Sequence, residues 1–221
     1  MDKKNSLKIR SLSILYLTLI FPVTVCNAQE EIKWTDWDRT AINGMELQVK
    51  SISGFTVVSD ATGFDLSEIT PKYEIPSYAI SIPEHRNLIK SKDGDFCAYL
   101  AFDRRGVSWN RVRRDIAYSR GEEQVDPISH ATFLPAEYAK KRFNADEVIT
   151  YSISLKEGPL KERYTDCEAI CIAKKDRGFI LLYCLYNNKK ELDKNRKKLE
   201  KMFWFRNPKD FINPVPEPSD T

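Results

Sequence analysis

Apolar and polar residues follow a period of two in several short segments, which predicts strands. Alternation over 46–58, with a glycine break, indicates a strand or bent hairpin, and alternation over 147–155 indicates a second strand. The segment "SYAISIP", residues 77–83, predicts a short strand that ends at its proline. The segment "DFCAYLAFD", residues 95–103, is a strand that follows a Lys-Asp-Gly-Asp turn. These segments would form the greater part of one sheet.

A long apolar hairpin is predicted near the C-terminus. In "CEAICIAKKDRGFILLYCLY", residues 167–186, the polar stretch turns the chain at Asp176, Arg177 and Gly178. Both strands of this hairpin carry apolar side chains on both faces, as strands do when both sides of a sheet are covered. We therefore expect the hairpin at the centre of the sheet.

A period of 3.6 residues predicts three helices. Ser108 can cap a helix over 108–120, and Pro135 suits the first turn of a helix over 135–143. The helix over 189–203 has charged residues toward water and an apolar side toward the core, formed by Leu192, Leu199, Met202 and Phe203. Strands and helices in this order predict an α+β domain, a mostly antiparallel central sheet with helices on both faces (an α-β-α sandwich).

Three segments carry a resemblance to a known family. The unit "KRFNADEVITYSI", then "YTDCEAICIAKK", then the closing "KMFWF" resembles the PsbP-like α-β-α sandwich, and is similar to uncharacterised secreted proteins of gut-dwelling bacteria. The resemblance covers roughly residues 45–205 and includes no catalytic motif. It implies the sandwich fold, and binding rather than catalysis.

The N-terminus has the layout of a secretory signal peptide. Residues 1–28 combine a basic head, an apolar run and a small residue, which predicts cleavage between Ala28 and Gln29. The apolar run is shorter than the ~20 residues that a membrane-spanning helix needs, although an uncleaved anchor is the alternative. A third interpretation is a lipid anchor on Cys26. The sequence therefore predicts export to the periplasm or the extracellular space.

Charge and composition bear on the partners and on the domain boundaries of the exported chain. Of the 35 basic and 32 acidic residues, the signal holds four and one, so residues 29–221 have 31 of each and no net charge. Nucleic-acid binders usually have a basic excess, so nucleic acid is not expected as a partner. We expect a flexible leader over 29–44, one domain over 45–206 and a proline-rich disordered tail over 207–221.

Four cysteines remain after cleavage, and their role is open at the level of sequence. An even number in an exported protein suggests disulfides. Cys167 and Cys171 would be ~13 Å apart along a strand, too far for a bond. Two pairings remain, Cys97–Cys167 with Cys171–Cys184, or Cys97–Cys171 with Cys167–Cys184. The alternative is free thiols that serve as small core residues.

Chemical roles for these cysteines are weakly supported. The chain has no Cys-x-x-Cys, and its two histidines are far from Cys167 and Cys171 in sequence, so neither a metal site nor a redox pair is expected. A cysteine hydrolase built on Cys97 with His130 or His85 is the enzymatic alternative.

Arginines and tryptophans give two further candidate contacts. An anion or partner site could form around Arg104, Arg105, Arg111 and Arg114, although a solvated helix face is the plainer interpretation. Trp34 and Trp37 could contact a partner or a membrane interface, or pack on the domain as a lid.

The leading functional prediction is an exported, non-enzymatic binding protein of the bacterial envelope that needs no cofactor or metal. Its partner would be another protein, and an immunity or inhibitor type of role fits its size and its lack of a catalytic motif. A lipid-anchored structural component and the cysteine hydrolase are the alternatives. Oligomeric state stays open, and no transmembrane span is expected in the mature chain.

Overall fold

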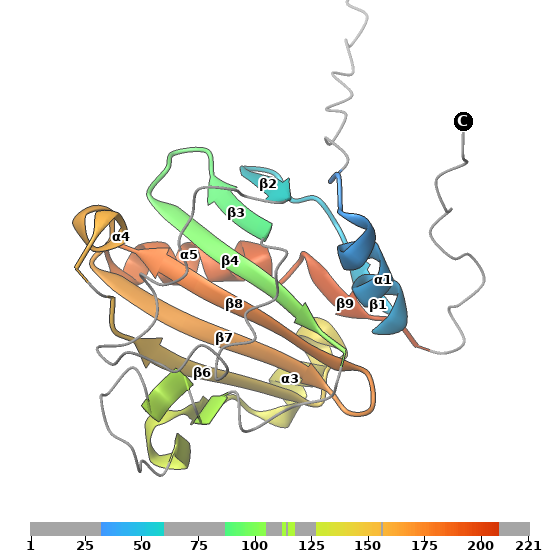
Figure 1. Cartoon of the computed structure of the whole chain (residues 1–221). Coiled ribbons are helices and arrows are strands. Elements are labelled where there is room, and N and C mark those ends of the chain that lie inside the picture. The colour runs from blue at the N-terminus through green and yellow to red at the C-terminus, as the bar shows by residue number, and fades with distance from the viewer. Residues whose placement is uncertain are drawn as a thin grey trace, which may run out of the picture.

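A computed structural model describes residues 32–59, 87–104, 112–113, 115–117, 127–155 and 157–207. It shows an α+β protein built around an antiparallel seven-stranded sheet (Figure 1). Across the sheet the strands run β2 (Phe55–Ser59), β3 (Asn87–Ser91), β4 (Phe96–Asp103), β8 (Gly178–Tyr186), β7 (Asp166–Lys174), β6 (Glu147–Ile153) and β5 (Thr132–Phe133). A second, two-stranded sheet pairs β1 (Leu47–Val49) with β9 (Phe203–Phe205).

The described residues also form a few short helices. They are α1 (Asp36–Gly44), the 3-10 helix η3 (Pro127–His130), α3 (Ala136–Phe143), α4 (Pro159–Arg163) and α5 (Lys189–Leu199). Asn188 caps α5 by accepting the backbone N–H of Glu191. Asn144 ends α3 in the left-handed conformation. Within the described ranges, no helix has the length and apolarity to cross a bilayer.

The predicted central hairpin is confirmed, with its turn one residue earlier than expected. Lys174 pairs with Gly178, so three residues form the loop. Asp176 has φ 62° and Gly178 has φ 125°, conformations that the aspartate tolerates and that the glycine adopts without strain. Because the loop is odd, Cys171 faces Leu181 and lies on the opposite face of the sheet from Cys184.

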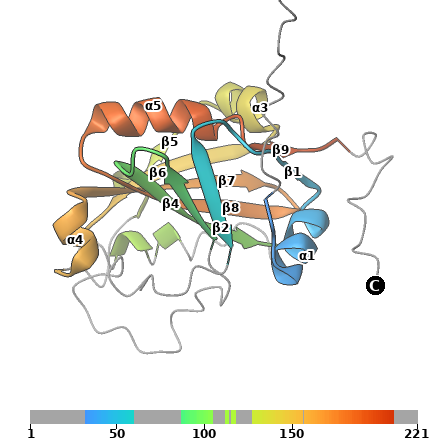
Figure 2. The same ribbon diagram turned by 90° about the horizontal axis from the view of Figure 1, so that it is seen from above.

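Each face of the sheet has its own core cluster. Helices α3 and α5 lie on one face (Figure 2), which they share with buried residues of α1 and of the β1–β9 sheet. On the other face, Val112, Ile116, Leu160 of α4 and Tyr164, which follows α4, are buried with Cys97 and other strand residues. The strands β7 and β8 contribute to both clusters, which explains why most of their residues are apolar on both faces.

The strands predicted over 46–58 exist, but the hairpin does not. β1 pairs with β9, and β2 pairs with β3, so the two strands belong to different sheets. Between them, Gly54 has φ 90° in a turn. The alternation of apolar and polar residues located the strands. It did not indicate the strands with which they pair, because those strands lie far away in the sequence.

The leader expected over 29–44 contains an ordered helix. Thr35 caps α1 by accepting the N–H of Asp38, and its hydroxyl donates to the Asp38 carboxylate at 2.6 Å. Asp38 is fully buried and accepts a 2.7 Å hydrogen bond from Asn87 of β3, while Ala41 and Ile42 enter the core. This corrects the expectation of a flexible segment. The Thr-x-x-Asp spacing was the local signal for the cap.

Several predicted segments lie outside the described residues. They are the signal peptide 1–28 with its cleavage site at Ala28 and Gln29, the strand 77–83, most of the helix 108–120 and the tail from residue 208.

Candidate functional site

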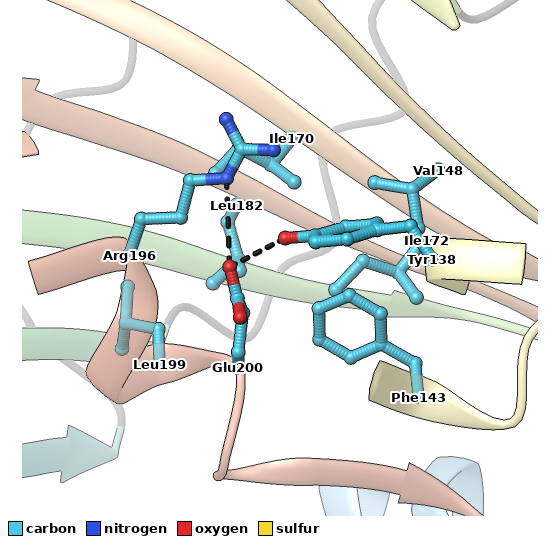
Figure 3. A pocket seen from close by; sticks show the side chains of 9 residues that line it. All are labelled: Tyr138, Phe143, Val148, Ile170, Ile172, Leu182, Arg196, Leu199 and Glu200. Carbon is cyan, nitrogen blue, oxygen red and sulfur yellow. Dashed lines mark hydrogen bonds and ion pairs between the residues drawn. The ribbon is translucent and has the colours of Figure 1, made fainter. Parts of the chain in front are cut away.

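A small recess opens between α3, α5 and the sheet (Figure 3). Its volume is about 10 Å³, room for roughly one water molecule. The sheet provides an apolar floor, and the two helices, with the residue that follows α5, provide the walls; the lining residues are Tyr138, Phe143, Val148, Ile170, Ile172, Leu182, Arg196, Leu199 and Glu200.

Glu200 forms the polar rim of the recess. It is 9% exposed, and it accepts a hydrogen bond from the hydroxyl of Tyr138. The Nε atoms of Arg142 and Arg196 lie 3.5 and 3.9 Å from its two carboxylate oxygens. Burial first, and then the bond to Glu200, raise the pKa of Tyr138. The tyrosine therefore stays neutral and acts as a hydrogen-bond donor.

A second buried carboxylate continues this network. Glu168 of β7 lies 2.7 Å from the ammonium of Lys189 and 3.7 Å from the guanidinium of Arg196. Arg196 thus stands between two carboxylates, which gives a row of alternating charges that we call the ion-pair row: Lys189, Glu168, Arg196, Glu200 and Arg142. The row fastens α5 and α3 to the sheet.

The ion-pair row was missed at the level of sequence. Glu168 did offer a signal, because it is a charged residue inside an otherwise apolar strand, between Cys167 and Ala169. Glu200 offered none, since it sits in a helix segment full of charges.

All four described cysteines are buried free thiols. Cys97 and Cys167 both pair with Leu185, from opposite sides, so the two are two strand spacings apart, about 9.6 Å. A disulfide needs Cα atoms within about 7 Å. Cys184 lies on the opposite sheet face from the other three, and Cys171 is four residues along the strand from Cys167. The register therefore forbids both pairings considered from the sequence.

The structure does not bring Cys97 to His130. Cys97 is on β4, whereas His130 is exposed beside β5, with β8, β7 and β6 between them. Burial raises the pKa of the Cys97 thiol to about 11, the reverse of what a nucleophile requires. His85 lies outside the described residues. Among the residues that the structure describes, no group of three His, Cys, Asp or Glu side chains could hold a metal ion.

Thiol labelling checks the state of the cysteines. In residues 29–221, we expect a disulfide-exchange reagent at pH 8 to label none of the four thiols in the folded protein, because all four are buried and burial raises the pKa of Cys97, Cys167 and Cys184. All four should react after denaturation. Fewer than four reactive thiols in denaturant without reductant would reveal a disulfide, and fast labelling of the folded protein would contradict their burial.

Of the four arginines considered as an anion or partner site, only Arg104 lies among the described residues. Arg104 is exposed, and its guanidinium lies against Gly44, the last residue of α1, where the helix carries partial negative charge. Arg105, Arg111 and Arg114 lie outside the described residues, so the anion site is not assembled in the described structure.

The two tryptophans have different environments. The ring of Trp34 packs edge to face on Phe102 at a centroid distance of 5.8 Å. Trp37, one turn later on α1, is 41% exposed. The first tryptophan therefore fixes the segment to the domain, and the second presents an aromatic surface.

Comparison with protein-family models, with curated proteins and with solved structures finds no match for this chain.

Proposed function

We propose that this protein is an exported, non-enzymatic binding protein that acts on another protein of the bacterial envelope, in the manner of an immunity protein or inhibitor. The signal-like N-terminus supports export, and the exposed indole of Trp37 is the observation that carries the binding role.

Trp37 has the properties of a binding anchor because its helix is held firmly. The buried Asp38 bonds to Asn87, and Ala41 and Ile42 enter the core, so α1 cannot shift easily. A large aromatic side chain on a rigid element loses little entropy on binding, and tryptophan is enriched among residues that dominate binding energy.

We further propose that helices cover both faces of the sheet, as in the PsbP-like sandwich that the sequence resembles. The burial of Val112 and Ile116 against the face opposite α3 and α5 supports a second helical layer. A sandwich of this kind leaves loops and edges for binding.

A photoreactive benzoylphenylalanine in place of Trp37 tests the proposal. In an envelope extract we expect one discrete cross-linked adduct, because an interface anchor contacts its partner directly. The matched control carries the same group at Lys141, which is exposed on α3. Trp37→Ala should weaken capture of that partner about thirtyfold, the effect of losing about 2 kcal/mol. Equal adducts at both positions, or none, would reject Trp37 as the anchor.

A further inference from the structure

A stripe of lysines runs along the outer side of α5. Lys190, Lys194 and Lys197 are exposed and lie within an arc of about 60° around the helix axis. The opposite side of the helix buries Leu192, Asn195 and Leu199. The lysine stripe therefore points directly away from the sheet, and Lys201 in the following turn is exposed as well.

Helix α3 extends the basic surface. It lies on the same face of the sheet as α5 (Figure 2) and exposes Lys140, Lys141 and Arg142. Two carboxylates beneath this layer, Glu168 of β7 and Glu200 after α5, are paired with basic side chains in the ion-pair row. Their negative charges hold the layer to the sheet instead of screening the outer lysines.

The segments that form α3 and α5 carry an excess of basic residues. Segments 136–143 and 189–201 together hold ten basic and four acidic residues, a net charge of +6. Residues 29–221 have 31 of each, so the remainder has 21 basic and 27 acidic residues and a net charge of −6. Asp93 of the β3–β4 turn lies near Lys194 and offsets a little of the positive charge. In the described structure, α3 and α5 thus form a basic face.

We infer that the α3–α5 layer docks on a membrane surface of anionic phospholipid headgroups. Two helices on the same face of the sheet form a broad basic surface, and each lysine or arginine near an anionic bilayer adds attraction. A protein partner fits this face poorly, because protein interfaces are depleted of lysine and centred on aromatic or apolar residues. The large apolar side chains exposed in the described structure, Trp37, Val58 and Phe133, all belong to other elements. Docking is therefore electrostatic and peripheral, and it leaves the α1 surface open to a protein partner.

Vesicle co-sedimentation tests this inference with residues 29–221, which retain every described residue. We expect no binding to phosphatidylcholine vesicles, and binding once about 40% phosphatidylglycerol is present, because attraction depends on surface charge. Salt at about 0.5 M should release the protein by screening. The variant K190E/K194E/K197E should partition about a hundredfold less, since each lysine contributes about fivefold.

The matched control changes the same charge elsewhere. In K33E/R113E/K161E, three exposed basic residues outside the layer are reversed, and binding should stay within about threefold of the unchanged protein because these residues are distant from the membrane. Circular dichroism checks that both variants fold. An equal loss in both would overturn docking through this face. No binding to phosphatidylglycerol vesicles would overturn the inference outright, and retention on heparin alone would assign the face to an anionic polymer.

Discussion

Replacing Gly178 with alanine is expected to cost at least about 3 kcal/mol of unfolding free energy, because strain and a clash with the backbone act together. Gly178 opens β8 with φ 125°, a conformation that side chains rarely adopt. A Cβ atom there would lie 2.1 Å from the carbonyl oxygen of Asp103. The clash is with backbone, so no rotamer change relieves it. Since β4 and β8 are central, the damage should spread through the sheet.

Gly54→Ala is the matched control for that change. Gly54 also has positive φ, 90°, but the nearest atom to an added Cβ is the flexible ammonium of Lys198 at 3.6 Å. We expect a cost of about 1 kcal/mol, the backbone strain alone. Urea denaturation followed by tryptophan fluorescence measures both. Equal losses would mean that the close approach of β4 and β8 at Gly178 is not present in solution.

Phe102→Ala is expected to cost about 3–5 kcal/mol, because it removes a large side chain from a well-packed core. Phe102 is 1% exposed and lies under the ring of Trp34. If the N-terminal segment is docked, Trp34→Ala and Phe102→Ala should couple by about 0.5–1.5 kcal/mol in a double-mutant cycle.

Phe96 supplies the control for the cycle. It is fully buried on the same strand, but its aromatic partner is Phe55. Phe96→Ala should be similarly costly, yet additive with Trp34→Ala within about 0.5 kcal/mol. A Trp34→Ala variant with wild-type stability and no coupling to Phe102 would restore the view of residues 29–44 as a flexible leader.

Local periodicity was sufficient for most of the described elements. The strand predicted over 95–103, the helix over 135–143 and the strand over 147–155 are present within a residue or two at each end. The terminal helix was predicted over 189–203 but ends at Leu199, so its predicted length was wrong. Leu192 and Leu199 are buried on the helix as expected, whereas Met202 and Phe203 are buried beyond its end, Phe203 as the first residue of β9. These features depend on neighbours within a few positions, and the sequence displays such neighbours directly.

The candidate site could not be predicted in the same way. Glu200 lies 62 residues from Tyr138 in sequence, and Arg196 reaches a strand that begins 30 residues earlier. From the sequence alone, charged residues in a helix are expected to face solvent, because the packing of the helix is not known. Only the placement of α5 over β7 turned two glutamates inward and left the lysines outside.

The cysteines show most clearly what the sequence determined by itself and what only the tertiary structure decided. The sequence by itself determined that Cys171 and Cys184 lie in two strands of an apolar hairpin, and that an odd loop would put them on opposite faces. It left open whether Cys97 could bond to Cys167 or Cys171, because partners on other strands have no local signature. The tertiary structure decided this by inserting β8 between β4 and β7, so that Leu185 separates Cys97 from Cys167. Strand order is set by the burial of both sheet faces together, a property of the whole chain that no single segment contains.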